Sequence, residues 1–133
     1  MSDDLAFVSA QIAGYHDYAD ERARHDSDMR VRAFVGLRLT AAQTRLAGSL
    51  DADTMKALED VLFRCMFTDQ VFIRKFEHAR LDAAMIAALV RSDRQLVEFA
   101  ERVQTVTAPE LRSLVIEIDK QFEYRRAPEP LHA

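Results

Sequence analysis

Two aspartates are the residues of this chain with the clearest potential for chemistry, because each interrupts an apolar helical stripe. At about 100° per residue, Asp69 and Asp93 both fall at the centre of the apolar face of their predicted helices. If the chain reverses near Leu81, both lie twelve residues from the turn and face each other. Two facing carboxylates in an apolar interior need a cation, a metal ion or a shared proton. The pattern therefore predicts a buried polar layer around Asp69 and Asp93.

Counting along the chain from the predicted turns brings further polar residues near the height of this layer. They are Arg30, Arg22, Asp26 and Asp119. One interpretation is a structural layer of ion pairs and hydrogen bonds that fixes the register of the helices. The other is a small-ligand or metal site, with enzymatic use of Asp69 and Asp93 as acid/base groups and Arg30 as the anchor of an anionic substrate. The sequence leaves both interpretations open.

Recognisable catalytic motifs are missing from the sequence. It contains no two Glu-x-x-His motifs on paired helices, as the di-iron bundles require, no glycine-rich phosphate loop and no Gly-x-Ser-x-Gly turn. The single cysteine, Cys65, falls on an apolar stripe and is expected to be a packing residue. We therefore predict no metal and no cofactor, and the sequence favours a non-enzymatic protein.

A second apolar line follows the predicted helix on the side opposite its core stripe. Phe63, Phe67 and Val71 occupy positions i, i+4 and i+8. Either the N-terminal segment covers this line, or the line is a self-association surface. In the second case the three side chains would be buried in a two-fold homodimer. The leading functional hypothesis is a non-enzymatic interaction or regulatory module that forms a homodimer and can also bind another protein.

Long helices are expected to position these residues, because 133 residues contain only three glycines and three prolines. Cap signals predict helices over 52–79, from Asp82 through Val103, and from the capping box Thr107-Ala108-Pro109-Glu110 onward. One unbroken helix over 4–47 would be roughly 65 Å long, so a kink or break near residues 25–28 is predicted. The expected fold is all-α, an antiparallel bundle of four to five helices.

Composition limits the expected partners and location. The 18 basic and 22 acidic residues give a net charge of −4 and are interspersed, so neither nucleic acid nor an anionic membrane is an expected partner. No apolar run approaches the roughly 20 residues of a membrane span, and the acidic N-terminus does not resemble a signal peptide. With one cysteine, a cytoplasmic location is predicted. Residues 1–126 are predicted to form one domain, and 127–133 a disordered tail.

Overall fold

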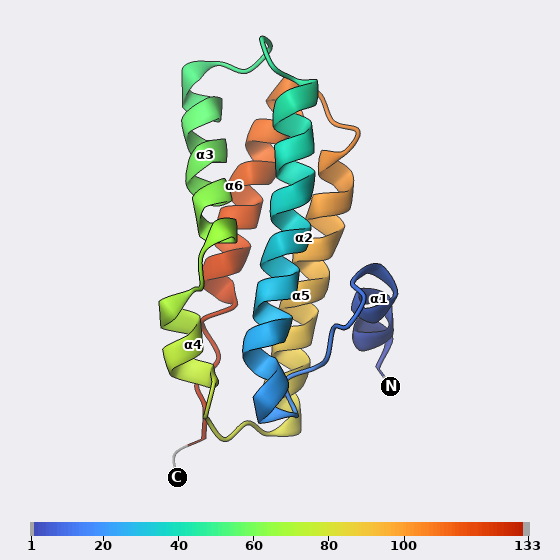
Figure 1. Cartoon of the computed structure of the whole chain (residues 1–133), viewed down its shortest axis with the longest axis vertical. Helices are drawn as coiled ribbons and strands as arrows, with labels where there is room; N and C mark the ends of the chain where they lie inside the picture. The colour runs from blue at the N-terminus through green and yellow to red at the C-terminus, as the bar shows by residue number, and fades with distance from the viewer. Residues whose placement is uncertain (1, 132–133) are drawn as a thin grey trace.

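The predicted bundle of α-helices is confirmed. The computed structural model describes residues 2–131 of the chain. Four long helices run side by side, the short α1 lies beside α5, and α4 continues beyond the end of α3 (Figure 1). The elements are α1 (Asp3–Gln11), the 3₁₀ turn η1 (Glu21–Ala23), α2 (Arg24–Arg45), α3 (Ala52–Met66), α4 (Gln70–Phe76), α5 (Ala83–Val103) and α6 (Ala108–Tyr124).

The N-terminal region is broken, but earlier than predicted. The break occupies residues 12–23, and residues 25–28 instead form the first turns of α2. Gly14 adopts a positive φ of 79°, which glycine tolerates and which turns the chain away from α1. The hydroxyl of Ser27 donates a hydrogen bond to the carbonyl of His16 over 2.7 Å, so the start of α2 holds the connecting segment in place.

The single helix predicted over 52–79 is wrong, because the chain breaks between α3 and α4. Phe67 has an extended backbone, with φ −123° and ψ 154°. Asp69 then caps α4: its side chain accepts a hydrogen bond from the Phe72 amide over 3.0 Å. The aspartate that seemed to interrupt one helix therefore begins another, and the ends of α3 and α4 meet at an angle (Figure 1).

The later cap signals predict the structure correctly. Asp82 accepts a hydrogen bond from the Met85 amide at the start of α5, over 2.9 Å. The Glu110 carboxylate accepts one from the Thr107 amide at the start of α6, over 3.0 Å. Short connections precede both helices. α5 and α6 pack as antiparallel neighbours, but α3, the larger part of the predicted 52–79 helix, packs on α2 and α6 and not on α5, so the predicted hairpin between these two helices is wrong.

Two clusters of apolar side chains form the core. The larger one lies among α1, α2, α3, α5 and α6, and a smaller one joins α4 to α5 and the N-terminal connector. Cys65 belongs to the larger cluster, and burial raises the pKa of its thiol to about 12. Its predicted place in the packed core is confirmed. None of the helices within residues 2–131 has the length and apolar character needed to cross a membrane.

The C-terminal segment runs back along α4. The amide of Leu131 donates to the carbonyl of Arg80 over 3.0 Å. The Lys75 ammonium bridges the carbonyl of Arg126, at 2.6 Å, and the carboxylate of Glu129, at 2.7 Å. Residues 127–131 thus have defined partners in a part of the chain for which the sequence predicts disorder, while the rest of that predicted tail, residues 132–133, lies outside the described residues.

Candidate functional site

Asp93 lies at the centre of a buried polar layer. Its side chain has no exposed surface, and three donors converge on its two oxygens. The Tyr15 hydroxyl donates over 2.7 Å, the Tyr18 hydroxyl donates to the same oxygen, and the Arg125 Nε donates to the other over 2.6 Å. The tyrosines come from the connector after α1 and the arginine from the end of α6, so this one carboxylate joins two other parts of the chain to α5.

Arg125 extends the layer toward α2. Its guanidinium donates to Asp28 over 2.6 Å and to the Tyr18 hydroxyl over 2.9 Å, and it lies 4.2 Å from the centre of the Phe72 ring. The second oxygen of Asp28 lies 2.9 Å from a guanidinium nitrogen of Arg32. Arg125, Asp28 and Arg32 are all at most 1% exposed. The result is a row of alternating charges, Asp93, Arg125, Asp28 and Arg32, inside the bundle.

Burial dominates the protonation of this layer. It raises the pKa of Asp93 above its usual range, against the Arg125 ion pair and the tyrosine hydrogen bonds. It also raises the pKa values of Tyr15 and Tyr18, so both hydroxyls stay protonated and act as donors. Burial opposes the charge on Arg125, but the neighbouring Asp93 carboxylate and other acceptors hold the arginine pKa well above its usual value. The two tyrosine hydroxyls and the Arg125 guanidinium therefore act as the donors of the layer.

The geometry around Asp93 supports the structural interpretation of the layer. Both of its oxygens are occupied, it is wholly excluded from solvent, and its cationic neighbour Arg125 is equally buried. A bound ligand or metal ion would have to displace one of these partners. A buried carboxylate with such partners ties helices together in one register.

The other residues predicted for this layer lie elsewhere. Arg30 and Asp26 form an ion pair of 2.6 Å on the surface of α2, where their side chains are about half exposed. Arg22 is exposed in η1, and Asp119 pairs with Arg64 over 2.8 Å at the α3–α6 edge. The turns near Ser49–Leu50 and Val106 lie where they were predicted. The distance from a turn gives the height of a residue but not its face, and on α2 it is Asp28 and Arg32, not Arg30 and Asp26, that point into the bundle.

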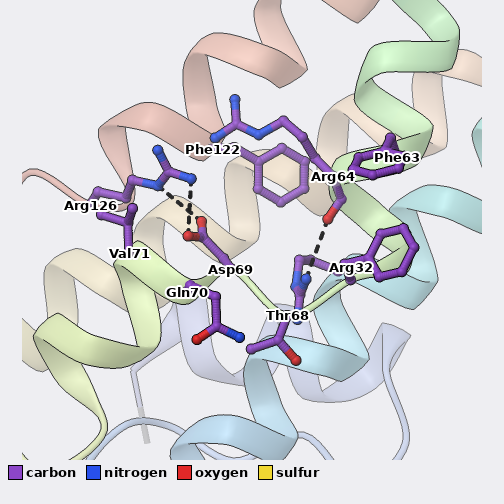
Figure 2. Close-up of a pocket in the computed structure, with 10 residues that line it drawn as sticks. Arg32, Phe63, Arg64, Thr68, Asp69, Gln70, Val71, Phe122 and Arg126 are labelled. Atoms are coloured by element: carbon purple, nitrogen blue, oxygen red, sulfur yellow. Dashed lines mark hydrogen bonds and ion pairs between the residues drawn. The ribbon is translucent and has the colours of Figure 1, made fainter.

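Asp69 is held by a different arginine from the one that neutralises Asp93. Arg126 Nε and Nη2 donate to its two oxygens over 3.0 and 2.9 Å. Figure 2 shows the two side chains pointing toward each other from α6 and the α3–α4 junction. Burial works against the ionised carboxylate, but the hydrogen bonds from Arg126 and the Phe72 amide are stronger in sum, and the pKa of Asp69 is lowered. The prediction that Asp69 and Asp93 face each other is therefore wrong. Asp93 pairs with Arg125, and Asp69 pairs with the next residue, Arg126.

Five layer residues were missed by the sequence interpretation: Tyr15, Tyr18, Asp28, Arg32 and Arg125. The sequence does contain a signal for Arg125. It follows Ile118 by seven residues and Phe122 by three, so it continues the apolar stripe of its helix. Arg125 lies at the predicted end of the helix, where fraying is expected, and a polar residue there does not by itself indicate burial. Tyr15 continues the apolar spacing of Leu5, Val8 and Ile12, but that spacing indicates only burial and not the bond to Asp93. Tyr18 lies in the irregular connector and has no periodic signal.

The Asp69–Arg126 pair gives a pH prediction. Asp69→Asn keeps a good helix cap but removes the charge, and we expect it to lower the free energy of unfolding by about 1 kcal/mol at neutral pH. Because the pKa of Asp69 is lowered in the folded protein, its stabilisation is complete above the ordinary value of 3.8 and is lost as the pH falls through the lowered value. Urea denaturation of both proteins between pH 7 and pH 2 measures this. A difference that stays constant over that range would contradict the assignment.

A cavity of about 290 Å³ lies at the α3–α4 junction beside Asp69. Its lining residues are Arg32, Phe63, Arg64, Phe67, Thr68, Asp69, Gln70, Val71, Phe122 and Arg126. The exposed fractions of Phe63, Phe67 and Val71 are 64%, 53% and 54%. Cover by the N-terminal segment, the first alternative for these residues, is therefore wrong: that segment packs against α5, on the other side of α2 (Figure 1).

The described residues contain no group of three or more His, Cys, Asp or Glu side chains arranged to hold a metal ion. The two features that remain are the buried layer around Asp93 and the exposed apolar residues around the cavity (Figure 2). Comparison of the chain with protein-family models, curated proteins and solved structures finds no match.

Proposed function

We propose that this protein is a non-enzymatic interaction module that forms a homodimer through the apolar surface at the α3–α4 junction. This surface, the α3–α4 patch, consists of Phe63, Met66, Phe67 and Val71. Their exposed fractions lie between 53% and 70%, and this exposure is the observation on which the proposal rests. Soluble proteins rarely expose several large apolar side chains together unless the surface binds something.

The size of the α3–α4 patch fits a second copy of the chain. If a fully exposed large side chain presents ~200 Å², the exposed fractions of its four residues correspond to roughly 450 Å² of apolar surface. A standard interface covers about 800 Å² per partner, a little more than half of it apolar, which is again about 450 Å². A two-fold dimer that buries the patch and its polar rim would therefore be of ordinary size.

The α3–α4 patch is also held in a fixed shape. The Phe63 and Phe67 rings pack against each other with their centres 4.7 Å apart. Asp69 caps α4 and pairs with Arg126 of the segment after α6, so the direction of α4 relative to α6 is fixed. A rigid patch loses little conformational entropy when it binds, which favours association. The proposal includes a cytoplasmic location, since the single cysteine is a buried thiol.

Phe67→Asp tests the proposal. The substitution places a charge at the centre of the α3–α4 patch, and burial of that charge in a dimer is unfavourable. We expect sedimentation equilibrium to show a dimer for the unmodified protein and an association at least about 30-fold weaker for the variant. Phe67 is half exposed in the monomer, so the free energy of unfolding at low protein concentration should change little.

Tyr124→Asp is the matched control. Tyr124 is 62% exposed, similar to Phe67, but lies in a separate groove between α5 and α6. It should leave the dimer intact. A protein that is monomeric at every concentration, or a dimer that tolerates Phe67→Asp and is lost with Tyr124→Asp, would overturn the proposal.

A further inference from the structure

The cavity at the α3–α4 junction combines aromatic walls with three guanidinium groups. Phe63, Phe67 and Phe122 supply apolar surface, and Arg32, Arg64 and Arg126 supply hydrogen-bond donors (Figure 2). A site of this kind, largely apolar with a few converging polar groups, is typical of small-molecule pockets. At about 290 Å³ the cavity is at the small end of that class, so it suits a ligand of one ring or a branched chain.

Arg126 is already fully engaged, but the other two arginines are not. The Nε of Arg32 is buried and has no hydrogen-bond partner among the described residues. The same is true of the Nη2 of Arg64, which lies 2.9 Å from Glu123 without the angle of a hydrogen bond. A buried charged donor without an acceptor is unfavourable. An acceptor that enters the cavity would relieve this.

Arg64 is the more accessible of the two. Its side chain is 21% exposed, and its partners Asp119 and Glu123 are about half exposed. Ion pairs with exposed carboxylates are weak, because water and salt screen them and the long side chains lose entropy. Glu123 also accepts hydrogen bonds from Arg126 over 3.2 Å, so it can give up Arg64 to another carboxylate while it keeps Arg126. Arg32 Nε and Arg64 Nη2 are both buried. A ligand can therefore reach Arg64 Nη2 only if the Arg64 side chain rotates slightly.

We propose that this cavity binds a small aromatic or branched-chain carboxylic acid, whose carboxylate replaces Glu123 on Arg64 and whose apolar body lies against Phe63, Phe67 and Phe122. Exchanging one carboxylate for another conserves the charge around Arg64. A doubly charged phosphate would add a negative charge next to Asp69 and Asp119, so the carboxylate is favoured. The guanidinium of Arg64 lies 5.4 Å from the Phe122 ring centre, which places charge and ring side by side.

The cavity shares Phe63, Phe67 and Val71 with the α3–α4 patch, so ligand binding is tested in a monomeric variant. Met66 belongs to the α3–α4 patch but does not line the cavity. Met66→Asp should therefore abolish the dimer and leave ligand affinity unchanged, while Arg64→Gln should weaken ligand binding about tenfold or more and leave the dimer. The two variants separate failure of one proposal from failure of the other.

Phenylacetate is the probe, with phenylacetamide and acetate as its matched controls. Titration of the Met66→Asp monomer, followed by ¹H–¹⁵N spectra that include arginine Nε–H resonances, should show saturable shifts of Arg32 and Arg64. The amide, which lacks the charge, and acetate, which lacks the ring, should each bind about tenfold more weakly or worse. The Arg64→Gln variant should weaken phenylacetate binding by a similar factor.

Glu123→Gln provides the sharpest test, because its expected effect has the opposite sign. Removing the competing carboxylate should tighten phenylacetate binding about threefold. Glu123 is half exposed, so the variant should fold normally. Equal affinity for the acid and the amide, weaker or unchanged binding by Glu123→Gln, shifts confined to another face, or no binding in the millimolar range would each overturn the proposal.

Discussion

Replacing Arg125 by methionine is expected to lower the free energy of unfolding by about 3–5 kcal/mol. Methionine fills much of the same volume and keeps contact with the Phe72 ring. The substitution leaves the carboxylates of Asp28 and Asp93 buried without the cation that joins them. The loss is large because the penalty comes from stranded charges, and it exceeds what the pair itself contributes.

Urea denaturation measures this effect, and two further variants identify its cause. Arg126→Met removes a neighbouring arginine that is 25% exposed and should cost about 1 kcal/mol. Adding Asp93→Asn to Arg125→Met should recover part of the lost stability, because it removes one stranded charge. If Arg125→Met costs no more than Arg126→Met, the buried layer does not hold the bundle together in the way described above.

The second large effect is expected for Arg24→Met, with a loss of about 3 kcal/mol. Arg24 is 5% exposed and donates to three backbone carbonyls: Tyr18 over 2.8 Å, Phe76 over 2.8 Å and Ala79 over 2.7 Å. These carbonyls belong to the N-terminal connector, the end of α4 and the α4–α5 turn. Without Arg24, buried carbonyl groups lose their partner and three irregular segments lose a common anchor.

Arg22→Met is the control for Arg24→Met. Arg22 lies two residues earlier and is exposed, so its replacement should change stability by less than about 0.5 kcal/mol. Hydrogen exchange of backbone amides should also become faster in the connector and the α4–α5 turn of Arg24→Met. Equal stability of the two variants would contradict the role assigned to Arg24.

Periodicity and cap residues predicted the helices well where a helix is regular. The stripe of α6 and its Thr107–Glu110 capping box located the last helix, because both signals are local and require no knowledge of the tertiary structure. The α3–α4 break was missed for a physical reason. In the sequence, Asp69 is compatible both with a buried position within one long helix and with the cap of a new helix. In the structure it is a cap, because it accepts a hydrogen bond from the Phe72 amide and pairs with Arg126.

The sequence predicted a buried polar layer around Asp93, but not the residues that pair with it. A buried carboxylate at Asp93 that requires a cation follows from the sequence, since no single helix can satisfy it. The identity of that cation does not follow, because Arg125 reaches Asp93 only once α6 is packed beside α5. Tyr15 and Tyr18 contribute from the connector after α1, where no helix sets the direction of their side chains. Long-range partners from irregular segments are the part of such a site that a single sequence does not contain.

The most direct test of the central claim, association through the α3–α4 patch, is an intermolecular NOE measurement. In a sample that mixes isotope-labelled and unlabelled protein, the Met66 and Val71 methyl groups should show contacts to the Phe63 and Phe67 rings of the other copy. The experiment records only NOEs between a labelled and an unlabelled chain, so each signal comes from a contact across the dimer interface. Intermolecular contacts at Tyr124 or Leu37, with none at Phe63 and Phe67, would contradict the claim.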